Sequence, residues 1–173
     1  VTTRTAGFNT IDLSNLSDSG TLLSLILMLI GGSPGSTAGG LKTTTIAVVV
    51  IAVFSMAKGG DDINTFKRRI VSDVVKQSAV IILIYLFAVM LSSMIICSVE
   101  GLGMSQVLFE TASAAGTVGV SKGITNQISA ISKIILMIMM YGGRIGGLSL
   151  VLVFGQRKPE APVKRPTEQI LIG

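Results

Sequence analysis

Two short segments contain the residue types from which backbone oxygens can form a cation filter. The segments, which share a threonine two positions before a glycine, are Thr5-Ala6-Gly7-Phe8 and Thr117-Val118-Gly119-Val120. A dehydrated cation needs a ring of oxygens, and backbone carbonyls supply it when successive carbonyls face the same space. Glycine allows the positive φ that such a backbone requires. We therefore predict that both segments, named here the first and second filter segments, bind a monovalent cation.

The filter segments belong to an internal repeat. Each is followed by an apolar run that ends in two adjacent glycines and a further glycine: Met28-Leu29-Ile30-Gly31-Gly32-x-x-Gly35 and Met139-Met140-Tyr141-Gly142-Gly143-x-x-Gly146. The two copies are about 111 residues apart. A lone Thr-x-Gly is a weak motif, and the alternative interpretation is that both segments are ordinary extracellular turns. The repeated order favours two pore loops, because repeats around a shared axis are a common way to build a membrane pathway.

Three apolar stretches must position the filter segments: residues 20–57, 74–98 and 128–154. As a helix, residues 74–98 would be about 37 Å long, which is enough to cross a bilayer core with some tilt. As a single helix, residues 20–57 would be about 57 Å long, nearly twice the hydrocarbon thickness. We therefore expect two half-helices there, at about 20–30 and 42–57. In the third stretch, we expect the glycines from Gly142 to Gly147 to interrupt the helix.

The middle of the first stretch cannot be a stable helix, since glycine costs about 1 kcal/mol per helical position and proline about 3 kcal/mol. Its sequence is Gly31-Gly32-Ser33-Pro34-Gly35-Ser36-Thr37-Ala38-Gly39-Gly40. Irregular backbone at membrane depth is tolerated only inside protein or along a water-filled path. We predict that this glycine-rich loop (residues 31–40) faces a pore. A phosphate-binding loop is the alternative that we reject, because Leu41 occupies the position at which the phosphate-binding motif has a lysine.

Residues 104–115 are too short to span a bilayer and are expected to form a re-entrant pore helix. The negative end of its dipole would then point at an ion in the second filter segment. Glu110, within this helix, is either a carboxylate of a packing network or an attractor of cations, and both interpretations stay open.

Arg144 is the one charged residue deep in the third apolar stretch. Burying a charge at membrane depth costs several kcal/mol, and arginine stays protonated. About 6 Å from a K⁺ ion, it would raise the ion's energy by about 3 kcal/mol at an effective dielectric of 20, which slows passage about a hundredfold. We predict that Arg144 forms part of a gate. A structural arginine that binds loop carbonyls is the alternative, and the two roles are compatible.

Composition assigns the chain to the membrane class. Hydrophobic residues make up 49% and charged residues 13% of the sequence, whereas soluble domains carry about 25% charged residues. The chain contains no histidine, which excludes His-rich zinc sites and Ser-His or Cys-His catalysis. Its single cysteine, Cys97, lies in an apolar run and is expected to be a packed thiol.

The net charge of +5 does not indicate nucleic-acid binding, because the basic residues flank apolar runs. They gather in two groups: Lys58, Lys67, Arg68, Arg69 and Lys76, then Arg157, Lys158, Lys164 and Arg165. By the positive-inside rule, residues 58–73 and the tail 158–173 should be cytoplasmic, with the filter segments toward the outside. The 58–73 segment is either a solvated loop or a docking site for a cytosolic partner.

Together, these residues resemble the Trk/Ktr/HKT superfamily of potassium transporters, and in particular its bacterial KtrB-type membrane subunit. The similarity rests on Thr3-Arg4-Thr5-Ala6-Gly7-Phe8-Asn9-Thr10, the glycine-rich loop with Leu41-Lys42-Thr43-Thr44, Met140-Tyr141-Gly142-Gly143-Arg144-Ile145-Gly146, and the ending Glu168-Gln169-Ile170-Leu171-Ile172-Gly173. Gly147 departs from it, because many relatives have proline there. The chain opens on Val1 without an initiator methionine or signal peptide, so we expect its N-terminal part to lie outside this sequence.

The resemblance implies an all-α membrane protein with four helix–pore loop–helix repeats around one pore and with broken second helices. Residues 1–57 would be the end of the third repeat, including a gating loop at 31–41. Residues 74–157 would be the whole fourth repeat.

The resemblance also implies a homodimer in the lipid of the bacterial plasma membrane. A KtrA-type cytosolic ring would bind the regulatory nucleotide, while K⁺ or Na⁺ would be the transported ion. Channel-like and Na⁺-coupled transport both stay open, as does a non-conducting membrane scaffold.

Overall fold

The computed structural model describes residues 5–9, 13, 16–36, 38–58, 64–65 and 68–145 of the 173-residue chain. This part of the chain is predominantly helical. Its elements are α1 (Asp18–Leu29), α2 (Thr43–Ala57), β1 (Asn64–Thr65), β2 (Arg68–Arg69), α3 (Ser72–Glu100), α4 (Met104–Ala115) and α5 (Ala130–Ile145). The expected helical class is confirmed for the described residues, in which β1 and β2 form a single short antiparallel pair within the 58–73 segment. A pair this short adds little stability and leaves the helical class unchanged.

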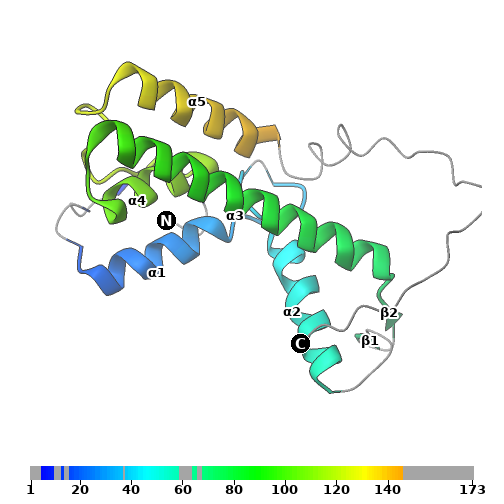
Figure 1. Cartoon of the computed structure of the whole chain (residues 1–173). Helices are drawn as coiled ribbons and strands as arrows, with labels where there is room; N and C mark the ends of the chain where they lie inside the picture. Colours follow the sequence, from blue (N-terminus) through cyan, green and yellow to red (C-terminus); the bar gives the residue numbers. More distant parts are fainter. Residues whose placement is uncertain are drawn as a thin grey trace, which may run out of the picture.

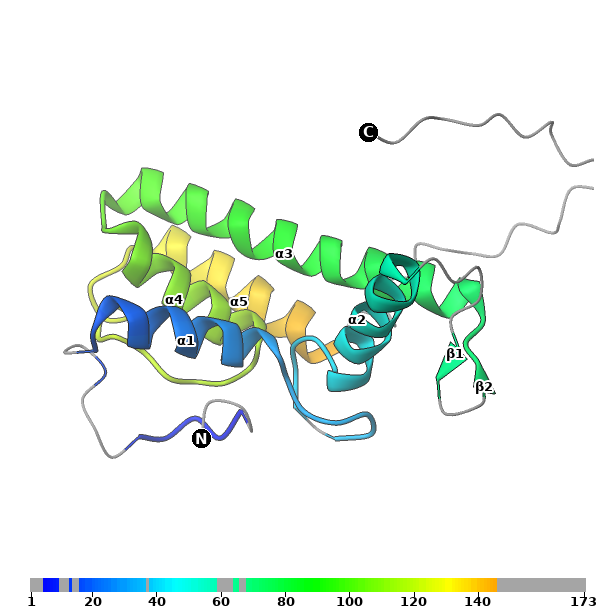
Figure 2. The same ribbon diagram turned by 90° about the horizontal axis from the view of Figure 1, so that it is seen from below.

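The helices gather around α4. α4 and α5 pack against the C-terminal part of α3 and against each other, and α1 packs on α4 (Figure 1). α2 instead packs against the N-terminal part of α3 (Figure 2) and points away from α1, α4 and α5 (Figure 1). The middle of α4 is enclosed, since Val107 and every residue from Phe109 to Ala115 is buried. α4 therefore forms the core of the described part of the chain.

α3 is the one helix, within the described residues, that is long and apolar enough to cross a membrane. Its 29 residues correspond to about 43 Å. It ends at Gly101, whose φ of 66° places it in the left-handed region that commonly terminates helices. Large apolar side chains such as Leu83, Phe87 and Met94 remain exposed along α3. Such a surface suits contact with lipid or with further apolar helices.

Small polar side chains allow α3 and α4 to approach closely. The hydroxyl oxygens of Ser93 and Thr111 lie 2.7 Å apart between the two helices, and both residues are fully buried. Ser93 also donates to the carbonyl of Val89, and Thr111 to that of Val107. Each hydroxyl thus has a partner within the apolar interior, as is usual where membrane helices pack closely.

Two helices lie close to the expected half-helices, but the interruption expected between Gly142 and Gly147 does not begin at Gly142 or Gly143. α1 and α2 end and begin on either side of the glycine-rich loop. α5, however, continues through Gly142 and Gly143 to Ile145. Two helical glycines cost about 2 kcal/mol, and the close packing that Gly143 permits against Ala115 of α4 offsets this cost. Gly146 and Gly147 lie outside the described residues, as does the tail 158–173.

Candidate functional site

The two filter segments share one backbone pattern. Thr5 and Gly7 have φ values of 51° and 67°, and Thr117 and Gly119 have 52° and 84°. Ala6 and Val118, between them, are not among the residues with positive φ. Alternation in the sign of φ rotates successive peptide planes, so that neighbouring carbonyls face one side instead of alternating as in a strand. Positive φ is uncommon for threonine, so its occurrence at equivalent positions of both segments indicates the same constraint on each.

The two filter segments also lie side by side. A Cβ placed on Gly7 would lie 2.8 Å from the carbonyl oxygen of Val118, and one on Gly119 would lie 3.5 Å from the Cα of Gly7. Gly7 and Gly119 are exposed, together with Ala6 and Phe8. Val118 and Val120 are buried against Met28 and Phe109, and the two threonines are half-buried. The folding chain therefore brings together two glycines that are far apart in the sequence.

The glycine-rich loop is closed at its base. Ile30 and Leu41 form a parallel β-bridge, and the N–H of Gly31 donates to the carbonyl of Leu41 at 2.7 Å. Lys42 holds the loop from one side, since its Nζ donates to the carbonyls of Ala38 and, at 3.3 Å, of Ser36. The tip, Ser33 to Ser36, is exposed, whereas Gly31, Gly39 and Gly40 are buried. Thr37 lies outside the described residues.

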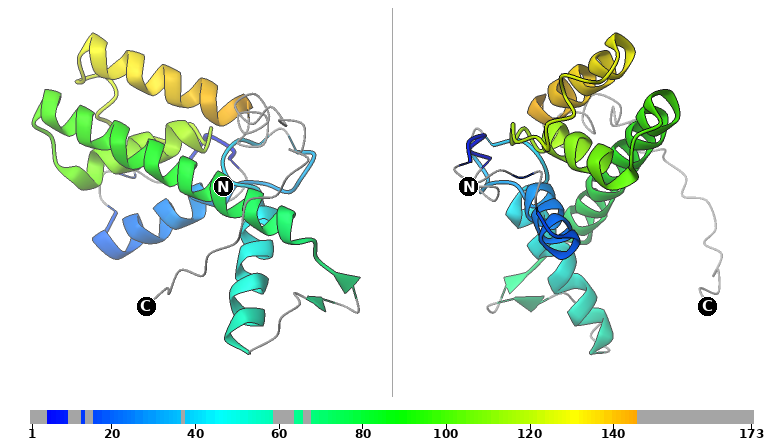
Figure 3. Two further views of the ribbon diagram at one scale, coloured as in Figure 1. Left: turned by 45° about the vertical axis from the view of Figure 1, so that its right-hand side comes forward. Right: turned by 90° about the vertical axis from the view of Figure 1, so that its left-hand side faces the viewer.

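The glycine-rich loop contacts the start of the second filter segment. The N–H of Gly39 donates to the hydroxyl of Thr117 at 2.8 Å. A Cβ on Gly39 would collide with the Thr117 side chain and lie 3.0 Å from the carbonyl oxygen of Gly143. Only glycine can approach both groups this closely, so this position requires glycine. Figure 3 shows the loop (cyan) beside the C-terminal end of α5 (orange).

The C-terminal ends of three helices meet at this point. Gly116, which follows α4, lies close to the carbonyl of Met28 near the end of α1. A Cβ added to Gly116 would lie 2.8 Å from the Met28 carbonyl oxygen. Gly143, near the end of α5, packs directly on the carbonyl of Ala115. Helix C-termini carry partial negative charge. The C-terminal ends of α1 and α4 beside Thr117 make this region electrostatically favourable for a cation, whereas α5 carries the positive charge of Arg144 in its last turn.

Arg144 lies in the last turn of α5 and is exposed. It lines a hollow of about 290 Å³ together with Gly39, Gly40 and Lys42. It also lines a second cavity, of about 430 Å³, with Glu110 and with residues of the second filter segment. Arg144 therefore lies beside both the glycine-rich loop and the second filter segment.

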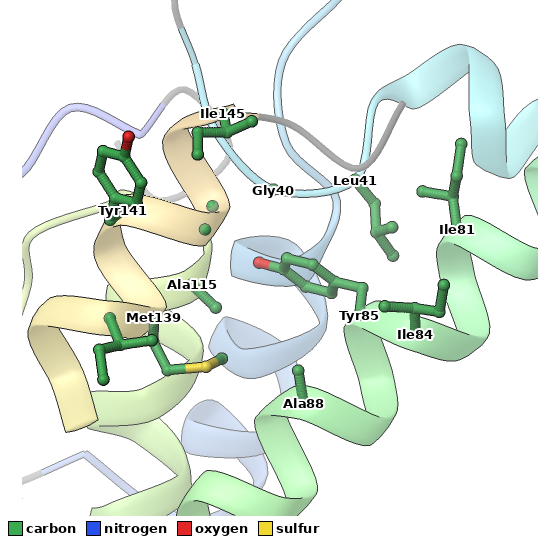
Figure 4. A pocket seen from close by; sticks show the side chains of 13 residues that line it. Gly40, Leu41, Ile81, Ile84, Tyr85, Ala88, Ala115, Met139, Tyr141 and Ile145 are labelled. Atoms are coloured by element: carbon green, nitrogen blue, oxygen red, sulfur yellow. The ribbon is translucent and has the colours of Figure 1, made fainter. Parts of the chain in front are cut away.

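An apolar cavity of about 360 Å³ lies on the other side of the loop, between α3 and α5. Figure 4 shows the Tyr85 side chain of α3 crossing it toward Gly40. The Tyr85 hydroxyl is buried and has no hydrogen-bond partner among the described residues. A buried hydroxyl without a partner is energetically unfavourable, and this one lies beside Gly40 of the loop.

Sequence reasoning missed Lys42, although a signal for it was present. Lys42 is the one charged residue of the first apolar stretch, as Arg144 is in the deep part of the third. The same argument that selected Arg144 therefore selects Lys42 as well. Sequence reasoning also gave no sign that the hydroxyl of Thr117 accepts a hydrogen bond from the loop.

Comparison with known proteins identifies the family of the chain. A family model described as "Cation transport protein" (TrkH) matches residues 1–164. The chain is 38% identical over 171 residues, 99% of its length, to the Ktr system potassium uptake protein D of Bacillus subtilis. It is 36% identical over its whole length to the potassium/sodium uptake protein NtpJ of Enterococcus hirae. It spans 38% and 40% of the lengths of these two curated relatives. The predicted resemblance is thus confirmed, and the chain belongs to the TrkH family of cation transport proteins.

Proposed function

We propose that the complete protein takes up K⁺ across the membrane through a pore whose wall includes both filter segments. One observation carries the proposal: Gly7 and Gly119 are adjacent, and each lies in a segment with the same alternation of φ. Each segment can then direct several carbonyls into one space, as dehydration of a cation requires. The remaining sides of the filter would come from two further repeats outside this chain. The converging C-terminal ends of α1 and α4 would stabilise the ion just below.

In this proposal, the glycine-rich loop and Arg144 restrict the pore beneath the filter. The hydrogen bond from Gly39 to Thr117 holds the loop directly under the second filter segment. Arg144, beside the loop, adds a barrier of about 3 kcal/mol if its charge lies about 6 Å from the ion at an effective dielectric of 20. Opening requires the loop to move aside. The apolar cavity next to Gly40 offers space for this movement.

The proposed assembly is a homodimer in a bacterial plasma membrane, with residues 58–73 and 158–173 on the cytoplasmic side. A cytosolic nucleotide-binding ring of the KtrA type would pull on the cytoplasmic ends of α2 and α3 and thereby withdraw the loop. The exposed apolar side chains of α3 would contact lipid or the missing repeats. The names of the relatives support K⁺ as the principal ion, and the name of NtpJ adds Na⁺.

Ion flux into liposomes that contain the complete protein tests this function. We expect K⁺ uptake by the unmodified protein and an increase of up to about a hundredfold in Arg144→Ala, because the charge barrier is lost. Deletion of several loop residues should raise the flux further. Lys133→Ala, which removes an exposed positive charge elsewhere on α5, is the control and should leave the flux unchanged.

The same measurement separates conduction from the alternative of a non-conducting scaffold. A scaffold predicts no K⁺ uptake by the complete protein with its regulatory ring, with or without the loop. Unchanged flux in both the Arg144 variant and the loop deletion would reject the gate while leaving conduction in place.

A further inference from the structure

Glu110 is a buried carboxylate whose task the filter and the gate do not explain. It lies in the middle of α4 and is 7% exposed. Its Oε1 accepts hydrogen bonds from the hydroxyl of Ser121 and, at 3.2 Å, from the hydroxyl of Thr125. A buried carboxylate is costly unless such donors satisfy it.

The partners of Glu110 belong to the chain that leaves the filter. Ser121 directly follows Val120, the last residue of the second filter segment. The Ser121 hydroxyl also accepts from the N–H of Gly123 at 2.8 Å, and it lies 2.9 Å from the Thr125 hydroxyl. Glu110 thus binds a turn that begins where the filter ends.

We propose that Glu110 positions the outer end of the second filter segment and thereby sets the preference of the pore for K⁺ over Na⁺. This inference rests on the proposed function. The filter backbone alternates in the sign of φ and so cannot form regular ladder hydrogen bonds to fix its own position. At the inner end, the segment is continuous with α4 through Gly116 and bonded to the loop through Thr117. At the outer end, the hydrogen bonds that Ser121 and Thr125 donate tie it to α4 through Glu110.

Positioning differs from simple attraction of cations by the negative charge. If Glu110 acts by position, the geometry of its acceptor oxygen matters and its charge matters less. Glutamine keeps an acceptor oxygen at the same place but carries no charge. Alanine removes both. The two substitutions therefore separate the two roles that the sequence alone leaves open.

The test measures K⁺ and Na⁺ uptake by the complete protein in liposomes. Glu110→Gln should retain the K⁺/Na⁺ ratio of the unmodified protein. Glu110→Ala should lower the ratio about tenfold, the order expected when a hydrogen bond to a charged acceptor is lost. The double variant Ser121→Ala/Thr125→Val should reproduce the loss without touching the carboxylate. Adding Glu110→Ala to it should cause little further change, because groups in one network are not additive.

Glu100 is the matched control. Its carboxylate likewise accepts from two serine hydroxyls, those of Ser129 and Ser132, but at the outer end of α3 and away from the filter. Glu100→Ala should lower thermal stability in detergent without changing the K⁺/Na⁺ ratio. If Glu110→Ala does not fold, the single variant Ser121→Ala tests the same contact.

Two results would overturn the inference. One is an unchanged ratio in a conducting Glu110→Ala or Ser121→Ala protein. The other is an equal loss in Glu110→Gln and Glu110→Ala, which would assign Glu110 to charge attraction. Absence of K⁺ uptake by the unmodified protein would instead contradict the proposed function.

Discussion

Lys42 is the residue whose contacts most directly hold the glycine-rich loop in place. Its ammonium donates to the carbonyls of Ser36 and Ala38, and its backbone lies next to the Ile30–Leu41 bridge. We predict that Lys42→Met raises K⁺ flux about fivefold or more, because a hydrogen bond contributes about 1 kcal/mol to the position that it holds. The measurement is uptake by the complete protein without its activating partner.

Loss of charge must be separated from loss of contact in this variant. Lys42→Gln keeps a donor but no charge, and is expected to retain part of the restriction. Lys76→Met, at an exposed position of α3, controls for removal of a lysine elsewhere. Equal flux in Lys42→Met and Lys76→Met would show that the lysine does not hold the loop.

At the residue scale, isolation in an apolar run was the useful sequence signal. It selected Arg144, and it points equally to Lys42. Glu110 could not be interpreted in this way, because its partners Ser121 and Thr125 are 11 and 15 residues away in an irregular turn. No periodicity relates a helix to such a turn, so only the folded chain identifies the acceptor and its donors.

At the element scale, two adjacent glycines of α5 have different surroundings and make a matched pair. A Cβ on Gly143 would collide with the carbonyl of Ala115, whereas nothing lies within 4 Å of a Cβ on Gly142. We predict that Gly143→Ala separates the end of α5 from α4 and lowers the free energy of unfolding by 1–3 kcal/mol, about the cost of overpacking. Gly142→Ala should be neutral or stabilising by up to about 1 kcal/mol, since alanine favours the helix.

Thermal unfolding of the complete protein in detergent measures both substitutions. Equal stability of the Gly143→Ala and Gly142→Ala variants would contradict the close packing of α4 and α5. A raised K⁺ leak in Gly143→Ala alone would agree with this packing, because the carbonyl of Gly143 also adjoins Gly39 of the loop.

The same glycines explain where element prediction succeeded and where it failed. Run length and apolar character located the helix around 74–98, which the structure extends to Ser72–Glu100. The glycine-rich loop separates α1 from α2, since ten positions rich in glycine with one proline give a large summed penalty. Gly142 and Gly143 carry a penalty too small to end α5, and tertiary packing outweighs it. Helix propensity therefore ends a helix only where many unfavourable residues occur together.

At the scale of the whole molecule, the internal repeat predicted that the two filter segments are equivalent. It could not predict that Gly7 and Gly119 are neighbours, because contact between repeats depends on how α1 packs against α4. The structure adds this relation. It also places the turn after the second filter segment at the end of α3 opposite to β1 and β2 (Figure 1).

That separation makes the orientation of the protein testable. The turn that contains Gln127 precedes Ser129, whose N–H donates to Glu100 at one end of α3. Lys58 follows α2, which packs against the other end of α3 (Figure 1). The length of α3, about 43 Å, exceeds the bilayer core. Because the basic residues cluster around 58–76, the positive-inside rule places Lys58 in the cytoplasm. Single cysteines at these two positions, in a Cys97→Ala background, should therefore differ in access to reagents.

We predict that Gln127→Cys reacts with a membrane-impermeant maleimide in intact cells, whereas Lys58→Cys reacts only after the membrane is opened. Both positions are exposed, so burial does not confound the comparison. Labelling after lysis shows that each thiol is reactive, and the Cys97→Ala background shows that the label is specific. If only Lys58→Cys reacted in intact cells, the orientation of the protein in the membrane would be the opposite of the predicted one. The filter would then face the cytoplasm, and a loop beneath it could no longer be opened by a cytosolic partner pulling on α2 and α3.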